Sequence, residues 1–227
     1  MIRAQPVLLL DFDHTLYPST LGTLKAVDDR INLYMQTFLG LSAPQADALR
    51  TELWDKYGTT LKGLEELHGV DREHYCDFIH AIEEKHLPPP DPALQAWLAR
   101  VPHACYVFTN ARSDWAIRGL KAMGLGELLP EGSAPHRFRA IFDIAFMEWE
   151  GKPNRPAYAK VDAHVREIHG PGARIHFADD RKDNLESARA QGWTTIWIHP
   201  HTAGPVVGDE FDRVVPSLTR LDPDSLA

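Results

Sequence analysis

The segment Val7-Leu8-Leu9-Leu10-Asp11-Phe12-Asp13 decides the fold prediction for this chain of 227 residues. Its apolar part is continuous rather than alternating, which is typical of a parallel strand covered on both faces. Two carboxylates, Asp11 and Asp13, follow directly after it. In an open parallel sheet, ligands bind beyond the carboxyl ends of the strands. The segment therefore predicts a buried strand that delivers carboxylates to a site at the sheet edge.

Three further apolar runs repeat this pattern along the chain, and two of them also end in polar pairs. They are residues 105–108 followed by Thr109 and Asn110, residues 174–178 followed by Asp179 and Asp180, and residues 194–198. Weaker strand candidates are residues 141–143 and 214–215. Patterns with helical spacing lie between the runs, at residues 91–99, 114–123, 155–168 and 182–191. Strands that alternate with helices predict an α/β fold, a Rossmann-like doubly wound parallel sheet.

The stretch from Ser19 to His86 breaks this alternation, because it contains only helical patterns. We expect four helices there, at residues 20–39, 43–56, 60–68 and 72–85. Three consecutive prolines at residues 88–90 then make a stiff exit. We therefore predict an α/β core formed by residues 1–18 and 88–227, with an all-helical cap of residues 19–87 inserted after the first strand.

Composition indicates an ordinary soluble globular protein, with 44% apolar residues, 25% charged residues and a formal net charge of -8. This acidic balance argues against nucleic-acid polymers and anionic membranes as the main partners. Cys76 and Cys105 show no metal-ligand spacing, which favours buried free thiols in a reducing compartment. The apolar run at residues 7–10 is too short for a signal peptide or a membrane span, so we expect a cytoplasmic protein, either a monomer or a homodimer.

The polar residues at the strand ends suit one kind of chemistry. Asp11, Asp13 and Asp180 would repel one another unless a cation neutralised them, and Mg²⁺ prefers such oxygen ligands and often binds a substrate phosphate as well. A carboxylate can attack phosphorus when a metal screens the repulsion between the two anions. Thr109 can donate a hydrogen bond to a phosphoryl oxygen, and Lys152 can supply a positive charge. These residues predict phosphoryl chemistry.

Asp11 and Asp13 are expected to share one side of the chain, because residues two apart in an extended segment point the same way. If Asp11 is the nucleophile, Asp13 can protonate the leaving oxygen and then deprotonate the attacking water. A calcium-binding EF-hand loop would need glycine and glutamate where the chain has Leu16 and Gly22, which counts against that reading of the pair.

Four motifs that follow one another along the chain resemble those of the haloacid dehalogenase-like hydrolases. The motifs are residues 11–16, Thr109-Asn110, Lys152 and residues 179–184. The resemblance implies that Asp11 is the nucleophile and Asp13 the acid/base, and that Thr109, Asn110 and Lys152 bind phosphate. It implies that Mg²⁺ is held by Asp11, Asp180 and the backbone carbonyl of Asp13, with Asp179 acting through water or behind the direct ligands. Asn184 stands where many family members have an acidic residue, and we expect it to lie behind the direct metal ligands.

A narrower resemblance concerns the substrate. Residues 13–19, 57–64 and 68–71 look like segments of the pyrimidine 5'-nucleotidase branch, which implies hydrolysis of a pyrimidine nucleoside monophosphate such as UMP or CMP. Tyr57, beside Gly58, is then the candidate cap contact to the substrate, whereas the spacing of Trp54 and Phe78 favours core positions.

Other functions remain open on sequence grounds. The chain could hydrolyse another small ester, such as a sugar phosphate or phosphoglycolate. A dehalogenase also uses an aspartate nucleophile, but it attacks carbon, needs no metal and lacks the second aspartate of the first motif, so Asp13 and Asp180 count against it. A non-catalytic binding protein on the same fold is the last alternative, since fold does not fix function.

Overall fold

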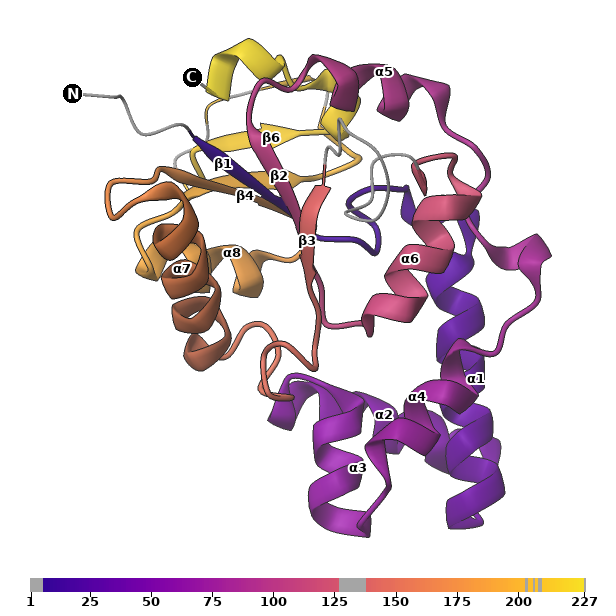
Figure 1. Cartoon of the computed structure of the whole chain (residues 1–227). Helices are drawn as coiled ribbons and strands as arrows, with labels where there is room; N and C mark the ends of the chain where they lie inside the picture. The colour runs from indigo at the N-terminus through magenta and orange to yellow at the C-terminus, as the bar shows by residue number, and fades with distance from the viewer. Residues whose placement is uncertain (1–5, 127–137, 203, 206, 208–209, 227) are drawn as a thin grey trace.

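A six-stranded, fully parallel sheet forms the centre of the molecule, with the strand order β3-β2-β1-β4-β5-β6 (Figure 1). The computed structural model describes residues 6–126, 138–202, 204–205, 207 and 210–226. The strands are β1 (Val7–Leu10), β2 (Ala104–Phe108), β3 (Phe138–Phe142), β4 (Ile175–Asp179), β5 (Thr194–Ile198) and β6 (Arg213–Val215). This order confirms the predicted Rossmann-like sheet, and both weaker strand candidates contribute to it, at β3 and β6.

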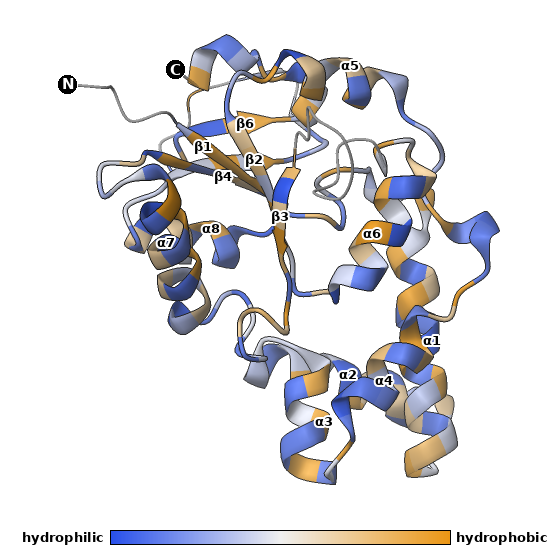
Figure 2. Cartoon of the chain, in the orientation of Figure 1, coloured by the Kyte–Doolittle hydropathy of each residue, from blue (hydrophilic) through white to orange (hydrophobic). Residues whose placement is uncertain are grey.

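Helices cover both faces of the sheet. Successive residues of a strand point to opposite faces, so each strand contributes side chains to both helical layers. Leu8 and Leu10 pack in one apolar cluster with side chains of α5 (Pro92–Arg100) and α6 (Ser113–Ala122). Val7 and Leu9 pack in a second cluster with α7 (Arg155–His169) and α8 (Lys182–Ala190). Figure 2 shows the hydrophobic strands enclosed between these helices. The continuous apolar run of β1 is thus explained by burial on both faces.

Four helices lie beyond the carboxyl edge of the sheet, and we call them the cap (Figure 1). They are α1 (Thr23–Leu39), α2 (Ala43–Tyr57), α3 (Thr60–His68) and α4 (Arg72–His80), preceded by the short 3-10 helix η1 (Ser19–Leu21). Side-chain caps begin three of them: Ser42 with Gln45 forms a capping box, and Thr59 and Asp71 accept hydrogen bonds from the first turns of α3 and α4.

The predicted helix over residues 72–85 is wrong at its end, because α4 stops at His80. The guanidinium of Arg118, on α6, donates hydrogen bonds to the backbone oxygens of His80 (3.1 Å) and Ile82 (2.7 Å). These carbonyl oxygens accept hydrogen bonds from the core instead of from a further turn of the helix. A short 3-10 helix η2 (Glu84–His86) then leads back to α5, and η4 (Leu218–Arg220) and η5 (Pro223–Leu226) close the chain after β6.

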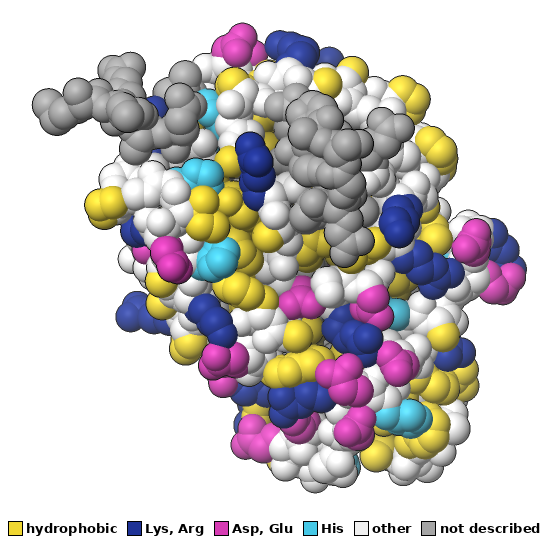
Figure 3. Space-filling view, viewed as in Figure 1, with side chains coloured by type: hydrophobic (Ala, Val, Ile, Leu, Met, Phe, Trp, Pro, Cys, Tyr) yellow, Lys and Arg dark blue, Asp and Glu magenta, His cyan; other side chains and the backbone are white. Residues whose placement is uncertain are grey.

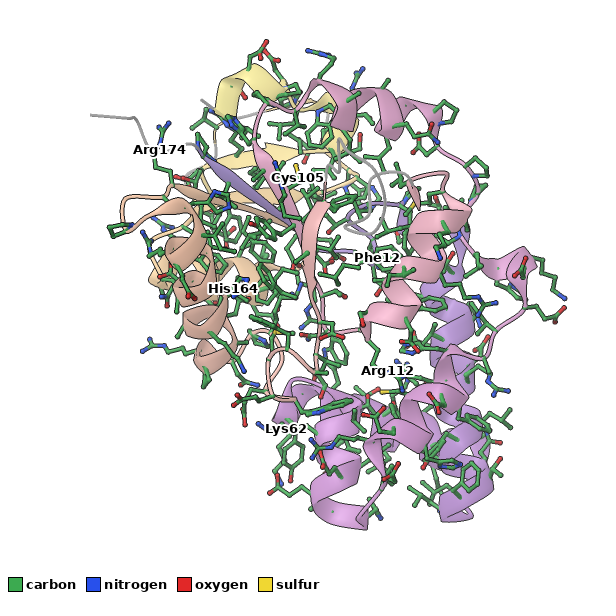
Figure 4. All side chains as sticks on the ribbon, viewed as in Figure 1. Phe12, Lys62, Cys105, Arg112, His164 and Arg174 are labelled. Atoms are coloured by element: carbon green, nitrogen blue, oxygen red, sulfur yellow. The ribbon has the colours of Figure 1, made fainter. Side chains whose placement is uncertain are left out.

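Charged groups hold the cap against the core. Lys62 of α3 lies 2.8 Å from Glu150, and Arg112 before α6 lies 2.9 Å from Glu73 and 2.7 Å from Asp77 of α4. Figure 4 labels Lys62 and Arg112 at this junction, and Figure 3 shows charges of both signs over the same part of the surface. Among the described residues, no helix combines the length and apolar character needed to cross a membrane.

Candidate active site

Lys152 lies at the centre of the polar residues that the sheet brings together. Its side chain is 2% exposed, and Nζ donates hydrogen bonds to Asp11 Oδ1 (2.7 Å), Asp179 Oδ2 (2.7 Å) and the backbone oxygen of Phe108 (2.8 Å). Burial lowers the pKa of Lys152, but the two carboxylates more than offset this and hold the pKa above its usual value. A permanent positive charge therefore links the ends of β1, β2 and β4.

The backbone of Lys152 is held by Asn110. The Asn110 side chain accepts a hydrogen bond from the Lys152 N–H (2.6 Å) and donates one to its carbonyl oxygen (2.8 Å). Gly151, the residue before Lys152, has a φ of +59, and a Cβ there would lie 3.0 Å from Ile144 and 3.3 Å from Asn110 Oδ1. Both the backbone angle and the close approach therefore require glycine.

The hydrogen bonds between Asn110 and Lys152 limit the phosphate-binding roles predicted for the residues at the end of β2. Both polar atoms of the Asn110 side chain bond the Lys152 backbone, so a contact from Asn110 to phosphate would come from the second N–H of its amide or from its own backbone. Thr109 is 1% exposed, and its hydroxyl oxygen accepts a hydrogen bond from the Ala111 N–H at 3.1 Å. The hydroxyl can still donate its own hydrogen to an anion in the cavity, as predicted for phosphate binding.

Asp11 follows β1 and is fixed from two sides. Its N–H donates to the Ala178 oxygen (2.9 Å), which extends the pairing of β1 with β4, and Thr15 Oγ1 donates to Asp11 Oδ2 (3.2 Å). Burial raises the pKa of Asp11 to about 6, with Asp180 and Asp13 adding to the rise and Lys152 opposing it. The site therefore holds more negative charge than one lysine neutralises.

Asp179 is completely buried and its oxygens are fully engaged. Oδ1 accepts the Arg181 N–H (2.8 Å), Oδ2 accepts Lys152, and the Asn184 amide donates to both oxygens at 3.1 and 3.0 Å. Burial raises the pKa of Asp179 to about 7 against the lowering effect of Lys152. The place of Asp179 behind the direct metal ligands stays a prediction.

Asp13 lies apart from this cluster, and aromatic residues hold it. Its Oδ1 accepts hydrogen bonds from the Tyr17 hydroxyl and from Trp115 Nε1, the latter at 3.4 Å. Burial raises the pKa of Asp13 above its ordinary value, and these two donors oppose the rise. Trp115 in turn stacks on His80 of the cap, with ring centroids 5.0 Å apart and planes at 10°. The cap thus touches the residue that orients Asp13.

The donor set fits a hard divalent cation. One oxygen each from Asp11, Asp179 and Asp180 lies within 4.8 Å of the others. Asn184 Oδ1 is buried and has no hydrogen-bond partner among the described residues, so an acceptor remains for a metal-bound water. His14 Nδ1 lies 3.7 Å from Asp180 Oδ2. Oxygen donors of this kind suit Mg²⁺.

A cavity of about 480 Å³ opens over these groups, between the core and the cap. Seven of the predicted residues line it: Asp11, Asp13, Thr109, Asn110, Lys152, Asp180 and Asn184. Tyr57 lines a neighbouring pocket of about 460 Å³ instead, so its predicted contact with the substrate would be made from beside the main cavity. Trp54 lines both pockets and is 38% exposed, and the core position expected for it is therefore wrong.

Sequence reasoning did not assign roles to Tyr17, Trp115, Asp28, Arg50 or His14, all of which touch Asp13 or Asp180 or line the cavity. A weak signal existed for His14, which lies within the first motif, and for Tyr17, which follows that motif four residues after Asp13. The others come from helices whose packing against the site leaves no local pattern.

Comparisons with known proteins give both sequence relatives and structural relatives. No family model matches the chain. Phosphate metabolism protein 8 from Saccharomyces cerevisiae is 24% identical over 200 residues, which cover 83% of this chain. The matched residues span 60% of the length of that curated relative.

Among solved structures, an L-2-haloacid dehalogenase from Xanthobacter autotrophicus aligns with a TM-score of 0.56 at 16% identity, covering 99% of this chain and 98% of its own. The HAD-hydrolase YfnB from Bacillus subtilis aligns with a TM-score of 0.54 at 16% identity, covering 87% of this chain and 90% of its own. Its structure is described as bound to magnesium and as revealing interdomain movement. The chain thus has the fold of the haloacid dehalogenase-like hydrolases, which confirms the predicted resemblance at the level of the fold.

Proposed function

We propose that the protein is a Mg²⁺-dependent phosphomonoester hydrolase in which Asp11 is the nucleophile. The observation that carries this proposal is the group of Asp11, Asp179 and the partly exposed Asp180 under the cavity, with Lys152 bonded to the first two carboxylates. The excess negative charge of this group favours a divalent cation, and the bound cation together with Lys152 would then attract an anionic substrate. Attack by an Asp11 oxygen on phosphorus gives an aspartyl phosphate and releases the alcohol.

Asp13 is assigned the proton transfers. Tyr17 and Trp115 both donate to its Oδ1, which leaves Oδ2 to carry a proton. Burial raises the pKa of Asp13, so protonation becomes easier than for an exposed aspartate. The protonated acid supplies hydrogen to the leaving oxygen, and the resulting carboxylate then removes a proton from the water that hydrolyses the aspartyl phosphate.

The remaining residues bind and orient the phosphate. Lys152 and the Thr109 hydroxyl are its proposed partners, with Asn110 holding the Lys152 backbone in place. Asp11, Asp180 and the Asp13 carbonyl would hold Mg²⁺, with Asp179 and Asn184 behind them. When bound, the metal screens the charge between carboxylate and phosphate and helps to align the two.

The cap is proposed to close over the bound ester and to limit water. Connections near residues 18–19 and 88–90 would act as hinges. Several contacts that join cap and core are charged and partly exposed, such as Lys62 with Glu150. Contacts of this kind are individually weak and can break and re-form. The interdomain movement described for YfnB supports this proposal.

The substrate is proposed to be a pyrimidine nucleoside monophosphate, on the sequence resemblance of residues 57–64. The formal net charge of -8 argues against a nucleic-acid polymer or an anionic membrane as the partner, and we propose a small phosphorylated substrate and a cytoplasmic location. Phosphate release should be measured with UMP, CMP, AMP, GMP, hexose phosphates and phosphoglycolate, with Mg²⁺ and with excess EDTA. Chloride release from 2-chloropropionate should be measured in parallel, because some structural relatives are dehalogenases.

The proposal expects Mg²⁺-dependent release that is fastest with UMP and CMP. Faster turnover of purine nucleotides or hexose phosphates would overturn the nucleotidase assignment and leave the phosphatase intact. Full activity in excess EDTA would overturn the proposed dependence on Mg²⁺. Chloride release without phosphate release would replace the phosphatase by a dehalogenase.

A further inference from the structure

The cap side of the cavity contains a polar pair with unused hydrogen-bonding capacity. Arg50 of α2 and Asp28 of α1 both line the cavity above Asp11, and Arg50 Nη1 lies 3.3 Å from Asp28 Oδ1. Nη2 of the same guanidinium lies 3.3 Å from Asp47 Oδ1. Arg50 Nε is buried and has no hydrogen-bond partner among the residues that the structure describes. The Arg50 side chain as a whole is 27% exposed and lines the cavity, so the N–H groups of Nη1 and Nη2 that these ion pairs do not use remain for an occupant.

The charge around Arg50 excludes one class of occupant. A guanidinium flanked by two carboxylates, Asp28 and Asp47, is already neutralised, and the three groups together are negative. A leaving group with a second anionic group, such as the carboxylate of phosphoglycolate, would be repelled by Asp28. The pair therefore favours a leaving group that is neutral and can both donate and accept hydrogen bonds.

The cavity wall beside the pair indicates the shape of that group. Leu24, Val27 and Ile31 lie at spacings of three and four residues on α1, so they share the face of the helix that lines the cavity. Trp54 adds an aromatic surface, and the Arg181 guanidinium lies 4.5 Å from its ring centroid. Apolar and aromatic walls around a small polar group suit a flat ring with a polar edge.

We propose that Arg50 and Asp28 select the alcohol part of the ester, by pairing with the adjacent acceptor and donor on the edge of a pyrimidine base. A guanidinium N–H of Arg50 donates to a carbonyl oxygen of uracil or to ring N3 of cytosine, and Asp28 accepts from the neighbouring N3–H of uracil or amino group of cytosine. This inference rests on the proposed function and specifies its substrate: a neutral heterocyclic nucleoside as leaving group, in preference to an anionic one.

The kinetic test compares kcat/KM for UMP, phosphoglycolate and acetyl phosphate, the last of which carries neither a ring nor an N–H. In Arg50→Met the value for UMP should fall about 10- to 100-fold more than the value for acetyl phosphate, because a charged hydrogen bond is lost. In Asp28→Asn the ratio of phosphoglycolate to UMP should rise about fivefold, because a like charge is removed. Lys25→Met is the control: Lys25 is also on α1, pairs with Asp29 on the surface, and should change nothing.

Equal losses on UMP and acetyl phosphate in Arg50→Met would overturn the inference, since the pair would then support only the structure of the cap. An unchanged phosphoglycolate ratio in Asp28→Asn would also overturn it. Arg50→Lys retains the positive charge without the guanidinium fork, so it should lose activity on UMP as Arg50→Met does. It also serves as the second variant if Arg50→Met fails to fold.

Binding of free uridine tests the inference without turnover. Calorimetry should show that wild-type protein binds uridine and that Arg50→Met weakens this binding at least about tenfold. Uridine binding that depends on Arg50, in a protein that releases phosphate from no ester, would overturn the proposed function and leave the recognition pair standing. Phosphate release with uridine binding that is absent or indifferent to Arg50 would overturn this inference alone.

Discussion

The core and the cap contribute to the same cavity in different ways. In the core, the functional groups are buried and bonded to one another: Lys152 alone makes three hydrogen bonds of 2.7 to 2.8 Å to the ends of three strands. In the cap, Arg50 and Asp28 sit on α2 and α1 and pair with each other at 3.3 Å, while partly exposed ion pairs of α3 and α4 join the cap to the core. The comparison suggests that the reacting groups are fixed before a substrate arrives, whereas the selecting groups can move with the cap.

The most severe test of this comparison is Asp11→Asn. The substitution removes the attacking carboxylate and a proposed metal ligand, so turnover should be abolished on every ester, whatever its leaving group. Phosphate release from UMP and p-nitrophenyl phosphate measures this, with Asp29→Asn on the cap surface as the matched control. Residual turnover that still depends on the identity of the ester would show that the core does not act alone in the chemistry.

Asp13→Asn should be less severe and should depend on the substrate. With UMP, loss of the acid should cost about 10²- to 10⁴-fold, whereas p-nitrophenolate leaves without a proton. The first step with p-nitrophenyl phosphate should therefore survive, but the second step lacks its base. Rapid-quench measurement should show a burst of about one equivalent of p-nitrophenol per active site, followed by slow turnover.

Equal losses on the two substrates without a burst would remove Asp13 from the acid/base role. The expected metal contact of Asp13 is a backbone carbonyl, so the amide variant should still respond to Mg²⁺. This response separates the proton-transfer role from a general loss of the site.

Acid should weaken the core through His176, a buried residue of β4 that is 7% exposed. Burial, with help from His103, lowers the pKa of His176 to about 4 from its ordinary 6.5. Between pH 6.5 and pH 4 the unfolded chain therefore binds a proton that the folded chain does not, and stability falls as the pH falls. Between pH 7 and pH 5 this contributes about 2 kcal/mol of lost stability.

Urea unfolding of wild type and His176→Leu at both pH values measures this contribution. The raised pKa values of Asp11 and Asp179 act in the opposite direction, because those carboxyls take up protons in the folded state first. They are common to both proteins, so the difference between wild type and variant isolates His176. A pH dependence that is identical in the two proteins would contradict the prediction.

The same contrast separates what the sequence predicts from what it does not. Strand ends in a parallel sheet converge by topology, so continuous apolar runs followed by Asp11, Thr109 and Asp179 were enough to predict the sheet and the place of the site. Lys152 could be found because its loop stands between two such motifs. These features depend on order along the chain and on the geometry of the sheet.

Features that depend on packing between distant elements could not be predicted. Asn110 turns its side chain to a loop 42 residues away, and Trp115 reaches Asp13 across 102 residues. Helical spacing identifies one face of α2 but not whether that face meets the core or a cavity, which is why Trp54 was misplaced. The early end of α4 has the same origin, since it depends on Arg118 from another element.

The smallest expected effect lies at the ion pair between Lys62 and Glu150, which joins the cap to the core at 2.8 Å with both side chains partly exposed. Such a pair contributes about 0.2–1 kcal/mol, so Lys62→Met should shift the closing of the cap, and with it KM for UMP, by no more than about fivefold. Glu150→Gln should give the same shift, and the double variant should add little, because both changes remove one interaction. The difference from wild type should shrink at high salt, which screens exposed charges. A loss as large as that of Arg50→Met, or full additivity in the double variant, would mean that this pair does more than hold the cap closed.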